Sequence, residues 1–99
     1  MVDGGLIWDE GNIGHATRHG VSRAEIDAMY DEGRWIVAED PLGRPEQERL
    51  VGEVPDSQRL VVVAVEWRET PRGWGRRPIS SWEARPHETA LWREDFEDG

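Results

Sequence analysis

The stretch from Leu60 to Val65 constrains the fold more than any other part of the chain, because all six of its residues are apolar. Successive side chains of a β-strand point to opposite faces of the sheet, so a strand with this sequence is apolar on both faces. Such a pattern is typical of a strand at the centre of a sheet. We therefore predict that RLVVVAVEWR, residues 59–68, forms a central strand.

Further strands are expected on either side of this run. Residues 34–39 and 47–54 each alternate with a period of two, and they are separated by a loop at 40–45 and followed by a turn at 55–58. After a second loop at 69–75, residues 76–82 read as a last strand. Pro78 indicates an edge position or a strand start, because proline donates no hydrogen bond to a neighbouring strand.

The best-marked helix starts at Ser22. Ser22 and Glu25 have the S-x-x-E spacing of a capping box, and Val21 and Ile26 stand where a hydrophobic staple would lie. Gly33 is expected to end the helix in the left-handed conformation.

Two other helices are predicted from weaker signals. Asp9 can cap a helix that runs through Arg18 and closes at Gly20, with Ile13 and Ala16 as its inward-facing residues. Pro86 suits the first turn of a final helix that reaches about residue 95, and the acidic end at 94–99 is expected to fray.

The order of these elements predicts an α+β fold. It favours an antiparallel sheet of three to four strands, with two N-terminal helices and one C-terminal helix packed on one face of the sheet. Ninety-nine residues are enough for one core but not for a second one beside it, so residues 1–99 are expected to form a single domain.

The charge of the chain limits its partners. The chain has 21 acidic and 12 basic residues, and its net charge is −9. Every basic residue is an arginine. Long-range attraction to nucleic acid is therefore not expected, and contact with RNA would need a local cluster of arginines. A basic protein partner is easier to justify.

Composition also bears on chemistry and location. The chain has no cysteine, which excludes disulfides and cysteine-ligated zinc. No apolar run approaches the roughly 18 residues of a membrane span, and the first residues lack the pattern of a signal peptide. We expect a cytoplasmic protein without a cofactor.

Two histidines raise the question of a metal site. His15 and His19 lie four residues apart and Asn12 precedes His15 by three, so all three fall along one stripe of the predicted helix. The segment lacks the glutamate of H-E-x-x-H, and only His87 remains as a third histidine. Hydrogen-bonded structural histidines are the preferred interpretation, and no metal site is assigned.

Arginines on three successive predicted strands form a second constellation. Arg49, Arg68 and Arg77 would meet on one surface if the faces of their strands coincide. Along the last strand, regular alternation would place Arg77 on the same face as Ile79 and Ser81.

Two interpretations of these arginines stay open. A cluster of guanidinium groups can hold a scissile phosphate and its developing charge while a histidine or glutamate moves protons. Alternatively, the arginines lie on a solvated face and pair with acidic neighbours. The acidic residues available for such pairs are Glu48, Glu53 and Glu66.

Several short motifs occur in an order that resembles one protein family. They are WDE-x-N at 8–12, RHGVS at 18–22, ER-x-x-G at 48–52, LVVV at 60–63, and Ile79–Ser80 followed by Glu88 and Trp92. This series resembles BrnT, the ribonuclease toxin of a type II toxin-antitoxin pair. The chain departs from the family pattern after Ser80, where residues 81–83 replace a basic segment.

The resemblance implies a RelE-like α+β fold and metal-independent cleavage of RNA. It also implies a ribbon-helix-helix antitoxin as the partner, and leaves open whether the chain forms a homo-oligomer. Under this hypothesis the phosphate is bound by Arg49, Arg68 and Arg77, and His19 or Glu88 transfers protons. The alternative is a toxin-like protein-binding module without catalysis.

Overall fold

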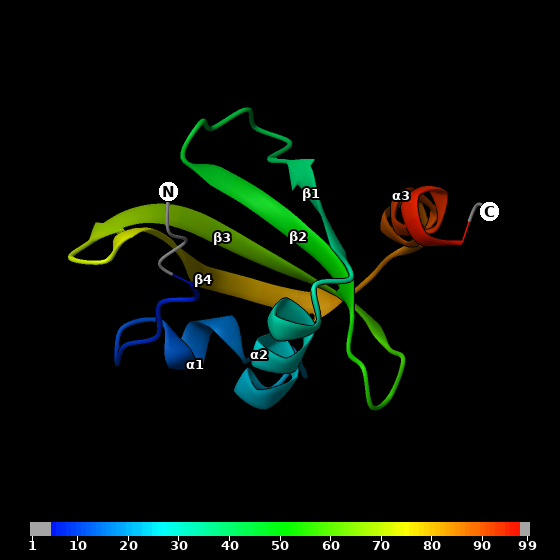
Figure 1. Ribbon diagram of the computed structural model, residues 1–99, viewed down its shortest axis with the longest axis horizontal. Coiled ribbons are helices and arrows are strands. Elements are labelled where there is room, and N and C mark those ends of the chain that lie inside the picture. Colours follow the sequence, from blue (N-terminus) through cyan, green and yellow to red (C-terminus); the bar gives the residue numbers. More distant parts are fainter. Residues whose placement is uncertain (1–4, 98–99) are drawn as a thin grey trace.

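The strand with two apolar faces lies inside a four-stranded antiparallel sheet (Figure 1). The structure is a computed structural model and describes residues 5–97. The strands, in sheet order, are β1 (Trp35–Glu39), β2 (Gln47–Glu53), β3 (Leu60–Thr70) and β4 (Gly73–Glu83). The predicted α+β class, the antiparallel sheet and the central position of β3 are confirmed.

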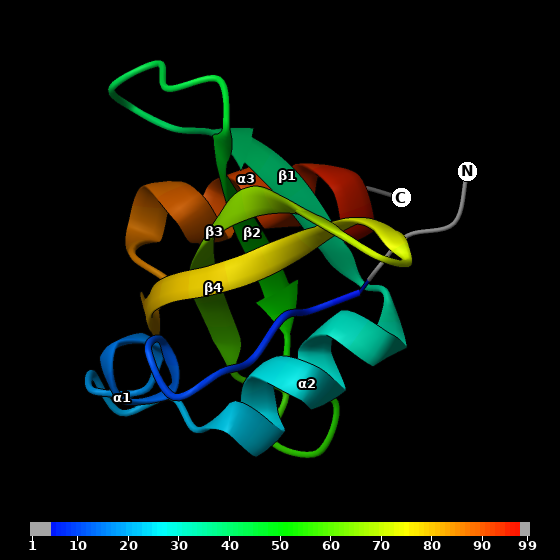
Figure 2. The same cartoon turned by 90° about the vertical axis from the view of Figure 1, so that its left-hand side faces the viewer.

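The helices cover both faces of the sheet, as Figures 1 and 2 show. On one face, Val61 and Val63 of β3 pack with Ile26 of α2 (Arg23–Glu32). On the other face, Val62 packs with Trp92 of α3 (Pro86–Phe96). The expectation that all helices lie on one face is wrong, because the side chains of β3 alternate between two cores and each core needs a covering helix.

The capping box of α2 is confirmed atom by atom. The Ser22 hydroxyl accepts a hydrogen bond from the Glu25 amide at 3.1 Å, and the Glu25 carboxylate accepts one from the Ser22 amide at 2.9 Å. Gly33 ends the helix at a φ of 81°. This helix forms where its local signals predict it.

The first helix is much shorter than predicted. Instead of running from Asp9 to Arg18, α1 spans only Ile13–Ala16. The Asp9 carboxylate accepts hydrogen bonds from the amides of Gly11 at 2.7 Å and Asn12 at 3.0 Å, which folds this part into a turn. Ala16 is buried as expected, but Ile13 is 39% exposed, so its predicted inward orientation is wrong.

The connection between β3 and β4 is a tight hairpin rather than the predicted loop at 69–75. β3 continues to Thr70 and β4 starts at Gly73. The Thr70 hydroxyl accepts a hydrogen bond from the Arg72 amide at 3.1 Å and donates one to the Gly73 carbonyl at 2.6 Å. These side-chain bonds hold the turn.

The outer edge of β4 is partly covered by the N-terminal segment. The Ile7 amide donates to the Arg76 carbonyl at 2.8 Å, and the Arg76 amide donates to the Gly5 carbonyl at 2.9 Å, in a short parallel bridge. Pro78 lies on this edge strand, as predicted. Further along, Pro78 pairs with Val65 and Ser80 with Ala64, so Ile79 forms a bulge without a partner in β3.

The C-terminal helix begins at Pro86 as predicted and ends at Phe96. Residues 98 and 99 of the predicted frayed tail lie outside the described residues, and fraying of residues 94–97 stays a prediction. Within residues 5–97, no helix is long and apolar enough to cross a membrane.

Two glycine-to-alanine substitutions test the packing between α2 and the sheet. A Cβ at Gly52 would lie 2.6 Å from Met29 Sδ and 2.7 Å from Trp35 Cβ. Gly52→Ala should lower the free energy of unfolding by about 1–3 kcal/mol through overpacking. At Gly14, in α1, nothing lies within 4 Å of the added atom. Gly14→Ala should therefore leave stability unchanged or raise it by up to about 1 kcal/mol. Urea unfolding measures both, and equal stabilities would contradict this packing.

Candidate functional site

The three arginines do lie on one face of the sheet. Arg49 pairs with Ala64 across β2 and β3, and Glu66 pairs with Arg77 across β3 and β4. Directly paired residues share a face, as do residues two apart on one strand, so Arg68 joins them on the side of Ala64 and Glu66. This is the face on which α3 packs.

α3 covers only part of that face. Its apolar side chains pack over the row of Val62 and Trp82. The next row has small side chains on either side of Arg49, namely Ala38, Ala64 and Ser80, all only partly buried. The arginines therefore project from an open, shallow part of the sheet beside the helix.

The bulge at Ile79 changes the expected neighbours of Arg77. Ser81 pairs with Val63 and points to the α2 face, where its hydroxyl donates to the Ala16 carbonyl. The predicted common face of Arg77 with Ser81 is wrong, because the extra residue Ile79 in β4 reverses the alternation beyond it.

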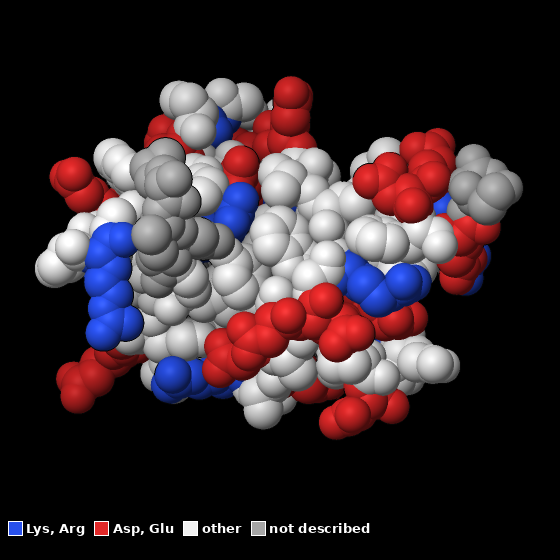
Figure 3. All heavy atoms as spheres, viewed as in Figure 1, with Lys and Arg blue, Asp and Glu red and all other residues white. Residues whose placement is uncertain are grey.

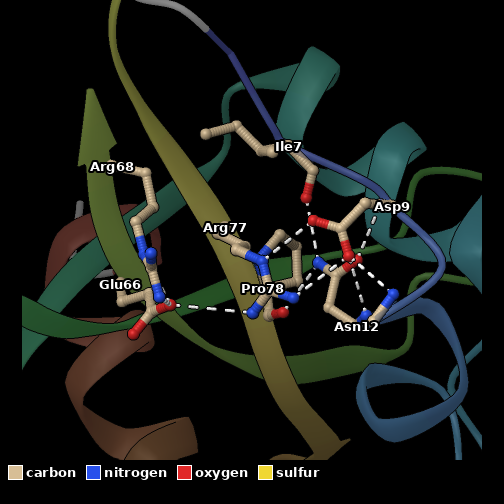
Figure 4. Close-up of polar contacts among 8 residues, drawn as sticks. Ile7, Asp9, Asn12, Glu66, Arg68, Arg77 and Pro78 are labelled. Carbon is tan, nitrogen blue, oxygen red and sulfur yellow. Dashed lines mark hydrogen bonds and ion pairs between the residues drawn. The ribbon is translucent and has the colours of Figure 1, made fainter. Parts of the chain in front are cut away.

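Arg68 and Arg77 are engaged by carboxylates (Figure 4). Arg77 donates two hydrogen bonds to Asp9, at 3.1 Å from Nε and 3.0 Å from Nη2. Its Nη1 also lies 3.6 Å from Glu66 Oε1, and the same oxygen accepts a hydrogen bond from Arg68 Nε at 2.8 Å. For these two arginines, the ion-paired interpretation describes the structure.

The Asp9 contact fixes the N-terminal segment beside β4. Hydrogen bonds from Arg77 lower the pKa of the Asp9 carboxyl below its usual value of 3.8. Asn12 is buried, and its side-chain amide donates to the carbonyls of Ile7 and Pro78, both at 2.9 Å (Figure 4). In the WDE-x-N motif, Asp9 and Asn12 thus have structural roles.

Arg49 is held differently from the other two. Its guanidinium lies 5.0 Å from the centre of the Trp82 ring, and Nη1 is 3.8 Å from Glu88 Oε2. Glu88 is almost fully buried and accepts hydrogen bonds from the Arg85 amide at 2.8 Å and from Trp82 Nε1 at 3.2 Å. The structure therefore brings Arg49 and Glu88 together, as the sequence-based hypothesis requires.

Three residues that the sequence analysis did not assign to the site join Arg49 and Glu88. Arg85 lies 5.1 Å from the Trp82 ring, and His87 Nε2 lies 4.0 Å from Glu88 Oε2. The predicted start of a helix at Pro86 was the available signal, since it places His87 and Glu88 in the first turn. We call Arg49, Trp82, Arg85, His87 and Glu88 the Arg49 cluster.

The charge of the Arg49 cluster contrasts with that of the whole chain. Two arginines and one glutamate give it a net charge of about +1 with neutral histidine, whereas the chain carries −9. Figure 3 shows acidic and basic side chains interspersed on one face of the molecule, with acidic atoms gathered over the outer part of α3. Among the described residues visible on that face, there is no continuous basic patch.

His19 does not join the arginines. It is exposed and precedes Gly20, whose carbonyl accepts a hydrogen bond from Arg59 at 3.1 Å. Arg59 lies just before β3, and Arg68 follows it by nine residues, which span about 30 Å in an extended strand. His19 and Arg68 therefore lie near opposite ends of β3.

The stripe of Asn12, His15 and His19 does not form either. α1 ends at Ala16, before His19, and Asn12 is buried while both histidines are exposed. Among the described residues, no three histidine, cysteine or acidic side chains are grouped so that they could hold a metal ion.

The arrangement offers groups for binding a phosphodiester and for moving a proton. The arginine guanidinium groups can donate hydrogen bonds to a phosphate above the partly buried row of small side chains, and the Glu88 carboxylate and the His87 imidazole are groups that can take part in proton transfer. Comparison of the chain with protein-family models and with curated proteins gave no match. The resemblance to BrnT stays a prediction based on the quoted motifs.

The Asp9–Arg77 contact predicts a pH-dependent difference between the wild type and Asp9→Asn. Because the folded state lowers the Asp9 pKa, the contact stabilises the fold above about pH 4, and this contribution is lost as the pH falls through the lowered value. The variant should be less stable than wild type at neutral pH, and the gap should narrow in acid. Urea unfolding across this range measures it, with the exposed Asp56→Asn as the control. A gap that does not change with pH would contradict the assignment.

Proposed function

We propose that the chain is a BrnT-like toxin component of a type II toxin-antitoxin pair, acting in the cytoplasm as a ribonuclease. The observation that supports it best is the gathering of Arg49, Arg68 and Arg77 on one open face of the sheet. α3 adds the buried carboxylate of Glu88 beside Arg49. The proposal assigns no metal or cofactor to the reaction.

In this proposal the arginines bind the scissile phosphate and stabilise the negative charge that develops on it. RNA supplies its own nucleophile, the 2′-hydroxyl, so the protein needs only to position the phosphate and transfer protons. Arg68 and Arg77 would exchange part of their contacts with Glu66 and Asp9 for phosphate oxygens.

The alternative is a toxin-like module that binds a partner protein without catalysis. Two observations favour it: Arg68 and Arg77 already have carboxylate partners, and the net charge of −9 opposes the approach of RNA. The same charge attracts a basic antitoxin.

Removing two arginines tests the ribonuclease directly. The double variant Arg49→Ala, Arg77→Ala should cleave RNA at least about 100-fold more slowly than wild type, because each arginine stabilises charge in the transition state. Cleavage of a labelled RNA by the purified, antitoxin-free protein measures the rate. Circular dichroism checks the fold, since Arg77 also holds Asp9.

The matched control is the double variant Arg18→Ala, Arg72→Ala, which removes the same charge from two exposed arginines. Arg18 lies in the join between α1 and α2, and Arg72 in the β3–β4 turn. Full activity in a folded Arg49→Ala, Arg77→Ala protein would exclude this site. If the wild type leaves RNA intact and does not slow growth on expression, the binding module is correct.

The partner can be tested separately from catalysis. We expect a small basic ribbon-helix-helix protein to be encoded beside this chain and to co-purify with it on co-expression. Complementary charge should make the affinity fall as the salt concentration rises. Titration of the two purified proteins at low and high salt measures this, and failure of the neighbouring protein to bind would contradict the pairing.

A further inference from the structure

A small hollow opens next to Arg49, between α3 and the end of β1. Its volume is about 180 Å³. The polar residues that line it are Glu39, Arg49, His87 and Glu88, and the apolar ones include Pro41, Val51 and Leu91. An apolar wall beside convergent polar groups is the usual character of a ligand site.

Of the three predicted arginines, Arg49 makes the fewest hydrogen bonds within the described residues. Arg68 and Arg77 donate hydrogen bonds to Glu66 and Asp9. Within residues 5–97, the guanidinium of Arg49 donates no hydrogen bond; its contacts are the Trp82 ring and the ion pair at 3.8 Å with Glu88. Its side chain is 26% exposed, so an anion in the hollow can reach it.

His87 lies where it can act on a group bound to Arg49. Its side chain is 68% exposed and lines the same hollow. The Glu88 carboxylate lies 4.0 Å from His87 Nε2 on one side and 3.8 Å from Arg49 Nη1 on the other. One buried carboxylate therefore lies between the Arg49 guanidinium and the His87 imidazole, and histidine is the side chain best suited to accept and return a proton near neutral pH.

We propose that the hollow binds one phosphodiester of an RNA chain on Arg49 and that His87 transfers the proton in its cleavage. This inference rests on the proposed ribonuclease function. The 2′ oxygen forms a bond to phosphorus as the bond from phosphorus to the 5′ oxygen breaks. The 2′-hydroxyl proton passes to the His87 imidazole, and the 5′ oxygen takes up a proton from the imidazolium, which leaves a 2′,3′-cyclic phosphate and a 5′-hydroxyl.

Glu88 is a positioning residue in this scheme. It is almost fully buried, and its oxygens already accept hydrogen bonds from the Arg85 amide and Trp82 Nε1. The apolar wall formed by Pro41 and Leu91 suits the base of a nucleotide next to the bound phosphate.

The test compares three histidine variants of the full chain. His87→Ala should lower kcat for RNA cleavage by about 100-fold or more. It should leave the affinity for a non-cleavable 2′-deoxy oligonucleotide of the same sequence close to wild type. Added imidazole should restore part of the lost rate, because position 87 is open to solvent. His15→Ala and His19→Ala, at exposed positions away from the hollow, should keep full activity. Arg49→Gln should weaken binding of the 2′-deoxy oligonucleotide.

The possible results separate this inference from the function on which it rests. Cleavage by wild type and equally by His87→Ala would overturn the role of His87 and leave the ribonuclease intact. A loss of activity that imidazole does not restore, with weaker oligonucleotide binding, would make His87 a binding residue and overturn the proton transfer. If Arg49→Gln binds the 2′-deoxy oligonucleotide as tightly as wild type does, the proposal that the phosphodiester binds in the hollow is wrong. RNA left intact by wild type would overturn the proposed function and this inference together.

Discussion

Burial of both faces of β3 is the constraint on which the rest of the structure depends. Val61, Val63 and Val65 point into the core under α2, and Val62 points into the core under α3. If helices covered only one face of the sheet, the apolar side chains on the other face would stay in water. This would cost about 25 cal/mol of folding free energy for each Å² of apolar surface left exposed. α3 is therefore needed on the second face. Because its first turn carries His87 and Glu88, the same requirement brings these two residues to Arg49.

Arginine has two different uses in this acidic chain. Arg76 lies on the α2 face, where its guanidinium is 4.2 Å from the Trp67 ring and its Nε is 3.2 Å from Glu48. Its side chain is largely buried, so it is a structural crosslink between strands and aromatic rings. Arg49 also lies on a tryptophan but remains open to solvent. The number of arginines therefore says little about nucleic-acid binding, and their engagement in the fold decides which can meet a ligand.

Much of the fold could be predicted from the sequence because its signals are local. The capping box at Ser22 and Glu25 and the alternation in the strands act over a few residues, and both gave the correct elements. The failures came from competing or long-range effects. The Asp9 carboxylate binds two backbone amides and replaces the first turns of a helix, and the side on which α3 packs is set by a core formed between distant segments.

The site was predictable in part for the same reason. Three arginines on successive strands can be placed on one face from alternation, and the register confirms it. Pairing with Glu66 was one of the two interpretations that the sequence left open, but no pattern predicts that Asp9 binds Arg77. Nor does a pattern predict that His87 and Glu88 lie beside Arg49, since these contacts depend on how α3 folds back over the sheet. The separation of His19 from the arginines likewise follows from the topology.

The bulge at Ile79 decides which side chains of β4 lie on each face of the sheet. Beyond it, Ser81 lies under α1 and Trp82 lies under Arg49, which is the reverse of what an uninterrupted strand would give. Loss of Ile79 alone would remove the extra residue but keep Ser81 and Trp82 on their present faces, because the residue pairs on either side of the bulge would stay in register. When this chain is aligned with other sequences, a gap at position 79 is therefore compatible with the same two surfaces, and Trp82 can still lie under Arg49.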